Sequence, residues 1–276
     1  MYMRLKDGKC KVFCMSYDDG FFHDIRFVET INKYGLKATF HLNTANWFPE
    51  DEIRDRPRGR LKLSEAKALY IGGPHELALH GHSHPFMEQL KPQEVLMEIL
   101  ENKREIEQTF GNLALGLGMP YGTYTEEVIE MAKMCGMEYV RAGGATNKLT
   151  FPVDWYHFGT TCRHNHPQLM EFAHQFVEKE PDRNYGINWM FCVGGHSWEF
   201  NRHKNWELLD ELGELVGGKD DIWYATIIEL RNYAKAYEAL QVSVDKKIVH
   251  NPTATDVWFE EKREVYCVKA GETIRL

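Results

Sequence analysis

Short apolar runs alternate with longer amphipathic segments along most of the chain. Each run has the length and the aliphatic or aromatic content of a buried strand, and polar residues or glycine bound it. The runs lie at residues 10–15, 37–42, 76–79, 113–117, 138–140, 189–193 and 222–225. Between them, apolar residues spaced three or four apart predict helices at residues 23–34, 64–71, 93–110, 125–135, 168–178, 205–215 and 227–240.

This order predicts a βα unit repeated about seven times, and therefore a parallel sheet that either closes into a barrel or stays open. Residues 43–62 and 141–166 read as long loops without regular structure. From Val242 the apolar residues alternate with polar ones, which predicts about three to five short antiparallel strands at the end of the chain.

Composition narrows the class of protein. The 276 residues include 33 Lys and Arg against 41 Asp and Glu, a net charge of −8 that argues against nucleic acid or an anionic membrane as the main partner. No apolar stretch is long enough for a membrane helix, and the first residues lack the apolar core of a signal peptide. We therefore expect a soluble, cytoplasmic protein whose six cysteines are reduced thiols.

Candidate metal ligands follow two of the predicted strands. Asp18 and Asp19 end the first strand, and His80 and His84 follow the third. Neighbouring carboxylates repel each other unless a cation or a shared proton intervenes, and strand ends carry the chemistry of βα folds. An acidic pair alone is more often a solvated turn, but together with two histidines it predicts a metal site. The spacing of four would point both rings the same way if a helical turn began there.

These segments resemble the motifs of the polysaccharide deacetylase family, which includes chitooligosaccharide deacetylases. Ser16-Tyr17-Asp18-Asp19-Gly20 resembles the family's Thr-Phe-Asp-Asp-Gly, and His80-Gly81-His82-Ser83-His84-Pro85 resembles its His-Thr/Ser-x-x-His-Pro. Met119-Pro120-Tyr121-Gly122 resembles Arg-x-Pro-Tyr-Gly, with Gly118 where the arginine belongs. Asp154-Trp155 and the strand-borne His196 resemble the two remaining motifs, so that the likeness spans residues 10–200.

The resemblance implies a distorted (β/α)7 barrel over residues 1–241, followed by the short antiparallel β extension 242–276. It implies Asp19, His80 and His84 as ligands of a divalent ion, with zinc first and cobalt, nickel, manganese or iron as alternatives. It assigns Asp18 as the general base, His196 as the general acid with Asp154 as its carboxylate partner, and the backbone N–H of Tyr121 to the oxyanion. Residues expected to contact substrate are Pro120, Trp155 beside His196, Arg163 and Trp198.

The function predicted from these residues is hydrolysis of an N-acetyl or O-acetyl group on an amino sugar or oligosaccharide. Gly118 is the main departure from the family, because the arginine steadies the catalytic aspartate. Arg141 or Arg163 approaching Asp18 from elsewhere is our hypothesis for its replacement. The alternatives are hydrolysis of a small amide, cyclic imide or ureide, and a catalytically inactive carbohydrate-binding protein. Oligomeric state, homo-oligomers included, is left open.

Overall fold

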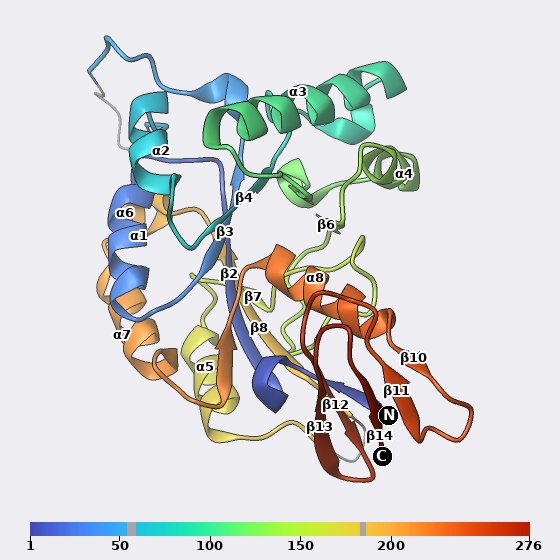
Figure 1. The fold of residues 1–276 in the computed structure, drawn as a ribbon. Coiled ribbons are helices and arrows are strands. Elements are labelled where there is room, and N and C mark those ends of the chain that lie inside the picture. The colour runs from blue at the N-terminus through green and yellow to red at the C-terminus, as the bar shows by residue number, and fades with distance from the viewer. Residues whose placement is uncertain (54–58, 183–185) are drawn as a thin grey trace.

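A parallel sheet forms the centre of the molecule in the computed structural model, which describes residues 1–53, 59–182 and 186–276 (Figure 1). The strands lie in the order β6-β5-β4-β3-β2-β8-β7, and β9 also pairs with β2. All of these pairs are parallel. The strands are β2 (Lys11–Asp18), β3 (Ala38–Leu42), β4 (Glu76–Leu79), β5 (Gly116–Gly118), β6 (Tyr139–Arg141), β7 (Cys162–Arg163), β8 (Trp189–Gly195) and β9 (Ile222–Tyr224).

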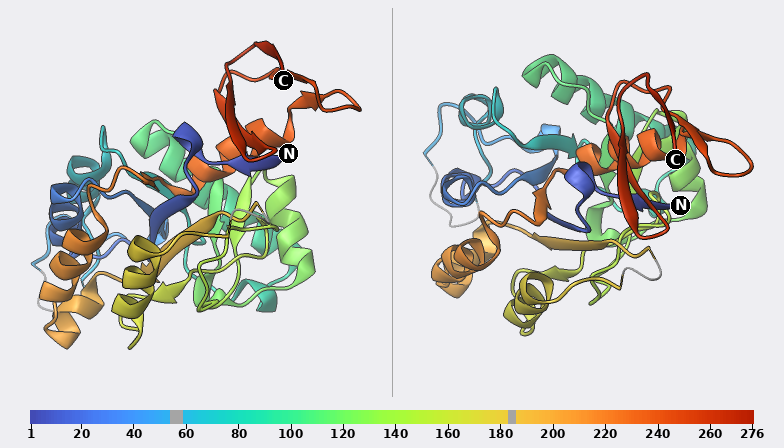
Figure 2. Two further views of the ribbon diagram at one scale, coloured as in Figure 1. Left: turned by 90° about the horizontal axis from the view of Figure 1, so that it is seen from below. Right: turned by 60° about the horizontal axis from the view of Figure 1, so that its bottom comes forward.

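Helices connect these strands and surround the sheet (Figures 1 and 2). They are α1 (Asp24–Lys33), α2 (Leu63–Tyr70), α3 (Pro92–Phe110), α4 (Glu126–Met134), α5 (Leu169–Glu178), α6 (Trp198–His203), α7 (Glu207–Val216) and α8 (Ile227–Glu238). In α3 the proline lies at the first turn and Gly111 follows with φ 77°, a left-handed residue that ends the helix. Val95, Ile99 and Ile106 form its buried face.

Strand β2 is the most central element, because it pairs with β3, β8 and β9 and all of its residues are buried. Phe13, Met15 and Tyr17 pack against the helices of the larger apolar cluster, and Val12 and Cys14 point into the second cluster on the other face. A strand buried on both faces is typical of parallel sheets covered by helices. Asp18 is the last residue of β2, so it lies at the carboxyl end of this central, fully buried strand.

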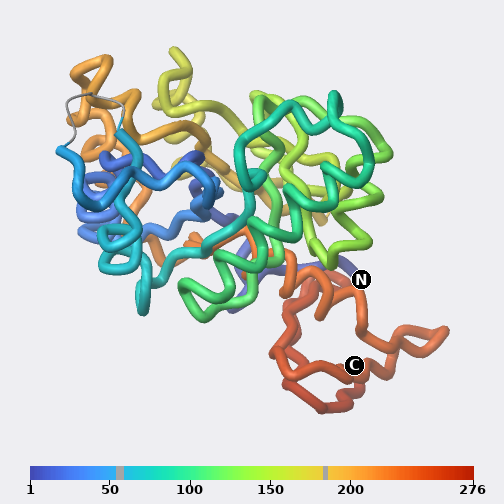
Figure 3. Tube along the Cα trace, turned by 90° about the horizontal axis from the view of Figure 1, so that it is seen from above, coloured from blue at the N-terminus to red at the C-terminus, as the bar shows by residue number. Residues whose placement is uncertain are grey.

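The C-terminal strands form two small antiparallel sheets beside the helices (Figure 3). One contains β12 (Val257–Glu261) and β13 (Glu264–Val268), and β12 also pairs with the N-terminal strand β1 (Tyr2–Arg4). The other contains β10 (Gln241–Val242), β11 (Ile248–His250) and β14 (Thr273–Arg275). Both termini consequently lie at this end of the molecule (Figure 2). Val249, Val257, Phe259 and Val268 form its apolar core.

The predicted fold class is confirmed, and the differences are local. Residues 141–166, expected to be irregular, contain β7, whose two residues pair with β8. Residues 43–62 contain the short 3-10 helix Thr44–Asn46 and bridges from Phe21 to Arg60 and from Phe48 to Lys62, while residues 54–58 of this predicted loop lie outside the described part. No helix in the described residues has the length and apolar content needed to cross a membrane.

Candidate metal centre and its surroundings

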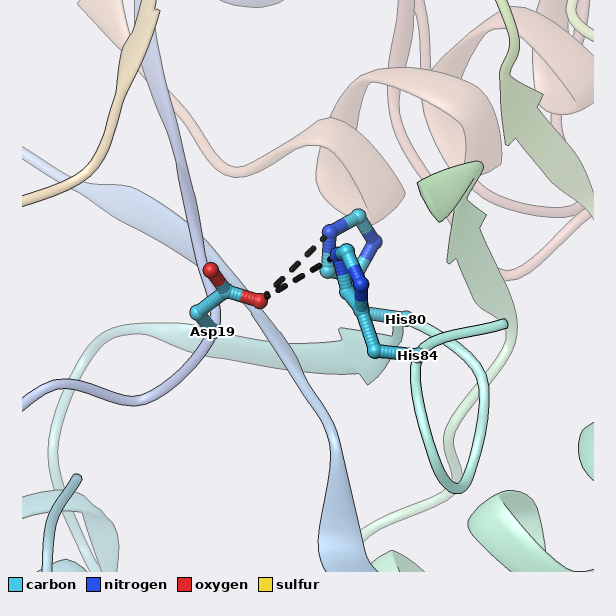
Figure 4. Close-up of side chains that lie close together, drawn as sticks. All are labelled: Asp19, His80 and His84. Atoms are coloured by element: carbon cyan, nitrogen blue, oxygen red, sulfur yellow. Dashed lines mark ion pairs between the residues drawn. The ribbon is translucent and has the colours of Figure 1, made fainter. Parts of the chain in front are cut away.

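Asp19, His80 and His84 converge at the carboxyl ends of β2 and β4 (Figure 4). Nε2 of His84 lies 3.5 Å from Oδ1 of Asp19, and Nε2 of His80 lies 3.9 Å from the same oxygen. One ligand atom from each residue lies within 4.8 Å of the others. The three side chains thus point into one space although they come from two strands that β3 separates.

Left-handed backbone conformations direct two of these side chains. Asp19 has φ 84° and His84 has φ 65°, values that are uncommon for residues other than glycine. Residues 80–86 are not helical, so a helical turn is not what points the rings of His80 and His84 the same way. The loop instead turns at Gly81, with φ 72°, and at His84. Such conformations persist where surrounding contacts hold them, and they are frequent at functional sites.

The three residues offer donor atoms suited to a divalent cation. Nδ1 of His80 donates a hydrogen bond to the Gly118 carbonyl at 2.6 Å, which leaves Nε2 with its lone pair towards Asp19. Burial lowers the pKa of His80 to about 4 and also lowers the pKa of His84. Oδ1 of Asp19 is buried and accepts no hydrogen bond from the described residues, although Nη1 of Arg60 lies 3.2 Å away. Two neutral imidazoles and one carboxylate therefore fit a cation with coordination places left open.

Asp18 is held by a residue on a different strand from the one that the family motif uses. Nη2 of Arg141 donates to Oδ1 of Asp18 at 2.6 Å, and Nδ1 of His41 lies 3.2 Å from the same oxygen. Burial by itself would raise the pKa of Asp18, but Arg141 and the two neighbouring histidines hold it well below its usual range. Asp18 is therefore a carboxylate, and its Oδ2 lies 3.9 Å from Nε2 of His80.

The position of Arg141 depends on the absence of a side chain at Gly118. The two residues are register partners on β6 and β5. A Cβ atom at residue 118 would lie 2.6 Å from Nη2 of Arg141 and 2.8 Å from Cδ2 of His41. Our hypothesis that Arg141 reaches Asp18 is confirmed, whereas Nη2 of Arg163 donates to Oε1 of Glu199 at 2.6 Å.

His196 follows β8, and its ring lies close to the candidate ligand Asp19. Its Nε2 lies 3.5 Å from Oδ2 of Asp19, and its Nδ1 lies 3.6 Å from Oε1 of Glu199. Burial opposes a charged imidazole, but Glu199 together with Asp18 and Asp19 raises the pKa of His196. Burial also opposes the charge on Glu199, yet contacts with His196 and Arg163 lower its pKa to about 2.

The carboxylate beside His196 is therefore Glu199, and not the expected Asp154. Asp154 is mostly exposed, and its oxygens accept from Tyr156 N at 2.8 Å and contact His157 Nδ1 at 2.7 Å. Sequence reasoning missed Glu199, although its place three residues after His196 in the first turn of α6 was a usable signal. His164 lies behind Glu199, with its Nε2 3.3 Å from Oε2.

The predicted aromatic wall beside His196 is made of different residues. Trp155 is buried in the second apolar cluster, where its ring packs on Phe151 and Phe158. The rings near His196 are Phe21 and Trp198, each with its centroid 6.1 Å away. Trp198 is only 9% exposed, so that it supports His196 from behind and offers no open face.

A pocket of about 390 Å³ lies over these groups. Its lining includes Asp18, Asp19, His80, His84, Arg141 and His196, and also Tyr121, Thr160 and Arg163. Glycines 143, 144, 194 and 195 form much of the remaining wall. Pro120 does not line this pocket; its ring packs beside Gly81, where an added Cβ would lie 3.4 Å from Pro120 Cγ.

The chain is similar to polysaccharide deacetylases in sequence and in fold. Residues 5–140 match the family model described as polysaccharide deacetylase. A comparison with curated protein sequences finds no match. Among solved structures, the chain resembles the Xyl-CE4 domain of a multidomain xylanase from the hindgut metagenome of Trinervitermes trinervoides. That likeness has 17% identity and a TM-score of 0.53, and it covers 82% of this chain and 92% of the other.

Two further structures have similar folds. A variant of a CE4 family pseudoenzyme from Bacillus anthracis, described as having restored enzymatic activity, shares 18% identity with a TM-score of 0.51 over 80% of this chain and 67% of the other. A family 4 acetyl xylan esterase from Clostridium thermocellum, in complex with a cobalt ion, shares 17% identity with a TM-score of 0.50 over 80% and 91%. The chain spans only 55% of the length of another matched protein, a Streptococcus pyogenes deacetylase.

Proposed function

The chain has the polysaccharide deacetylase fold and matches that family's model over residues 5–140, and on this basis we propose that it is a metal-dependent deacetylase of amino sugars or oligosaccharides. The observation that carries this proposal is the convergence of Asp19, His80 and His84 between Asp18 and His196. The pocket above them is open enough for an acyl group and is lined by groups that can act as base and acid.

Asp19, His80 and His84 would hold the divalent ion. When bound, such an ion lowers the pKa of a water ligand towards about 7 and polarises an acyl carbonyl. The two imidazoles and one carboxylate suit zinc, cobalt, nickel, manganese or iron(II), and availability selects among them.

Asp18 would act as the general base. Its Oδ1 is occupied by Arg141 and His41, which leaves Oδ2 to take the proton of the attacking water. Arg141 keeps the carboxylate anionic and fixes its orientation, so that Oδ2 faces the side of the metal ligands, 3.9 Å from His80 Nε2.

His196 would donate a proton to the leaving group. Glu199, Asp18 and Asp19 raise its pKa and so favour the protonated ring, and Glu199 holds the Nδ1 side of the ring so that Nε2 faces the pocket. Tyr121 lines the pocket next to His84, and by the resemblance to the family its backbone N–H would stabilise the oxyanion.

Two measurements on the purified protein test these assignments. Acetate release from tetra-N-acetylchitotetraose and from acetylated xylo-oligosaccharides should require an added or retained divalent ion. The variants Asp18→Asn and His196→Ala should keep the metal measured by elemental analysis and lose at least about 100-fold in kcat. The variants Asp19→Ala and His80→Ala should lose the metal itself.

Each alternative has a distinct result in the same experiments. Ring opening of a cyclic imide without any acetate release would assign the site to small C–N substrates. Saturable binding of oligosaccharide without product would assign a carbohydrate-binding protein. Metal loss in Asp18→Asn would overturn the division between base and ligand.

A further inference from the structure

Two exposed aromatic rings form a stacked pair at the rim of the pocket. Phe86 is 41% exposed and Tyr121 is 56% exposed. Their rings are parallel, with centroids 3.8 Å apart and an interplanar angle of 9°. Tyr121 also lines the pocket and meets the ring of His84 edge-on, at 4.5 Å between centroids. The two rings therefore lie in a row with His84, a predicted metal ligand, with Tyr121 in contact with both His84 and Phe86.

The loops beneath this pair are packed tightly. Met87, next to Phe86, is buried with 1% of its surface exposed. A Cβ atom at Gly81 would lie 3.0 Å from Cε of Met87 and 3.1 Å from Cδ of Pro85, so that there is no spare room under the loop after β4. Pro120 packs on the same spot from the loop after β5. The two rings are thus fixed by their supports, and their exposure does not come from a loose loop.

Fixed and exposed aromatic surface beside a polar pocket is typical of a binding surface, because folding by itself gains nothing from leaving two large rings in water. The −8 net charge of the chain disfavours nucleic acid as the group that stacks there. The C–H face of a pyranose ring is uncharged and flat, and it suits an aromatic face or edge. Trp198, the residue that the sequence suggested as a sugar platform, is too buried for this role.

We infer that Phe86, stacked on Tyr121, contacts a sugar ring next to the one that is deacetylated and so selects longer substrates over single sugars. This inference rests on the proposed deacetylase function and adds a specificity residue to it. Phe86 is a specificity residue in this view: it contacts the substrate away from the reacting acyl group.

The test compares long and short substrates with Phe86→Ala. The KM for tetra-N-acetylchitotetraose, or for acetylated xylotetraose, whichever the wild type uses, should rise about tenfold, which corresponds to about 1.4 kcal/mol. Its kcat should stay within about twofold, and the hydrolysis of 4-nitrophenyl acetate should not change, because that ester is too short to reach the rings. Phe86→Tyr should retain the wild-type KM, since it keeps the ring.

Phe22→Ala is the matched control. Phe22 is also 41% exposed, but its ring meets His23, which does not line the pocket, whereas the ring of Phe86 stacks on Tyr121, which does; Phe22→Ala should therefore behave like the wild type. Equal KM values for the wild type and Phe86→Ala with the tetramer would overturn this role of Phe86. If the wild type releases no acetate, calorimetric binding of the same tetramers tests the role independently. Weaker binding by Phe86→Ala than by Phe22→Ala supports it, and equal or absent binding refutes it.

Discussion

At the scale of single residues, Asp18 is held by an arginine from a strand that is not its direct neighbour in the sheet. The motif that this chain resembles places an arginine where the chain has Gly118, and Asp18 receives a guanidinium from the register partner Arg141. Neighbouring parallel strands bring their paired residues to the same edge of the sheet. Arg141 on β6 can therefore reach Asp18 past β5, because residue 118 has no side chain in its path.

Arg141→Ala should lower kcat about 100-fold, because Asp18 then loses both its orientation and the charge that keeps it ionised. Metal content should be unchanged, since Arg141 does not contact Asp19, His80 or His84 in the described structure. Steady-state kinetics and elemental analysis provide the two measurements.

Moving the arginine back to its family position sharpens this test. Gly118→Arg alone should be inactive, because the new side chain would clash with Arg141 and His41. Gly118→Arg combined with Arg141→Ala and His41→Ala removes both obstructing side chains and should regain activity over either single variant. If all three variants were equally inactive, the exchange of positions would be refuted.

At the scale of elements, Glu76 joins several parts of the barrel. Its Oε2 accepts from Oγ1 of Thr39 on β3 at 2.7 Å and from Ile228 N in the first turn of α8 at 2.9 Å. Its Oε1 accepts from the hydroxyl of Tyr139 on β6 at 2.7 Å. A carboxyl group at a helix N-terminus satisfies N–H groups that the helix itself cannot pair. Burial nevertheless dominates and raises the pKa of Glu76 to about 7.

The stability of the protein should accordingly depend on pH through Glu76. Between its ordinary value of 4.5 and about 7, the folded state keeps this proton while the unfolded state releases it. Protonated Glu76 therefore contributes its full stabilisation below pH 4.5. This contribution is lost as the pH rises through about 7, which lowers the free energy of unfolding by up to about 3 kcal/mol.

Urea denaturation of Glu76→Gln at pH 5 and pH 8 measures this contribution. Because the amide cannot ionise, the variant should lose less stability than the wild type over that interval. An identical loss in both proteins would show that Glu76 keeps an ordinary pKa in the folded state.

At the scale of the whole molecule, the N-terminal strand ties the C-terminal sheets to the barrel. Nη2 and Nε of Arg4 donate to Oε2 of Glu260 at 2.7 and 2.9 Å, and the arginine is fully buried. Tyr233 links both strands to α8, because its hydroxyl donates to the Arg4 carbonyl at 2.8 Å and accepts from Trp258 N at 2.9 Å. The two ends of the chain thus fold against one helix of the barrel.

Arg4→Met should lower the free energy of unfolding by about 3 kcal/mol, because it leaves the Glu260 carboxylate buried without a partner. Combining Arg4→Met with Glu260→Leu should recover most of this loss, since no charge then remains in the interior. Chemical denaturation measures both variants. A single variant as stable as the wild type would mean that Glu260 reaches water when Arg4 is removed.

The local pattern of the sequence was sufficient for the main βα units and for the residues at their strand ends, but not for β1, β7 or α6. Periodicity depends on near neighbours, and parallel strands present their carboxyl ends at one edge, so the positions of Asp19, His80 and His84 along the chain are enough to group them. Only the tertiary structure decided that Arg141 holds Asp18, that Glu199 and not Asp154 supports His196, and that Phe86 stacks on Tyr121. Those contacts join different strands and loops, and they depend on strand order, register and left-handed turns, which spacing along the chain does not encode.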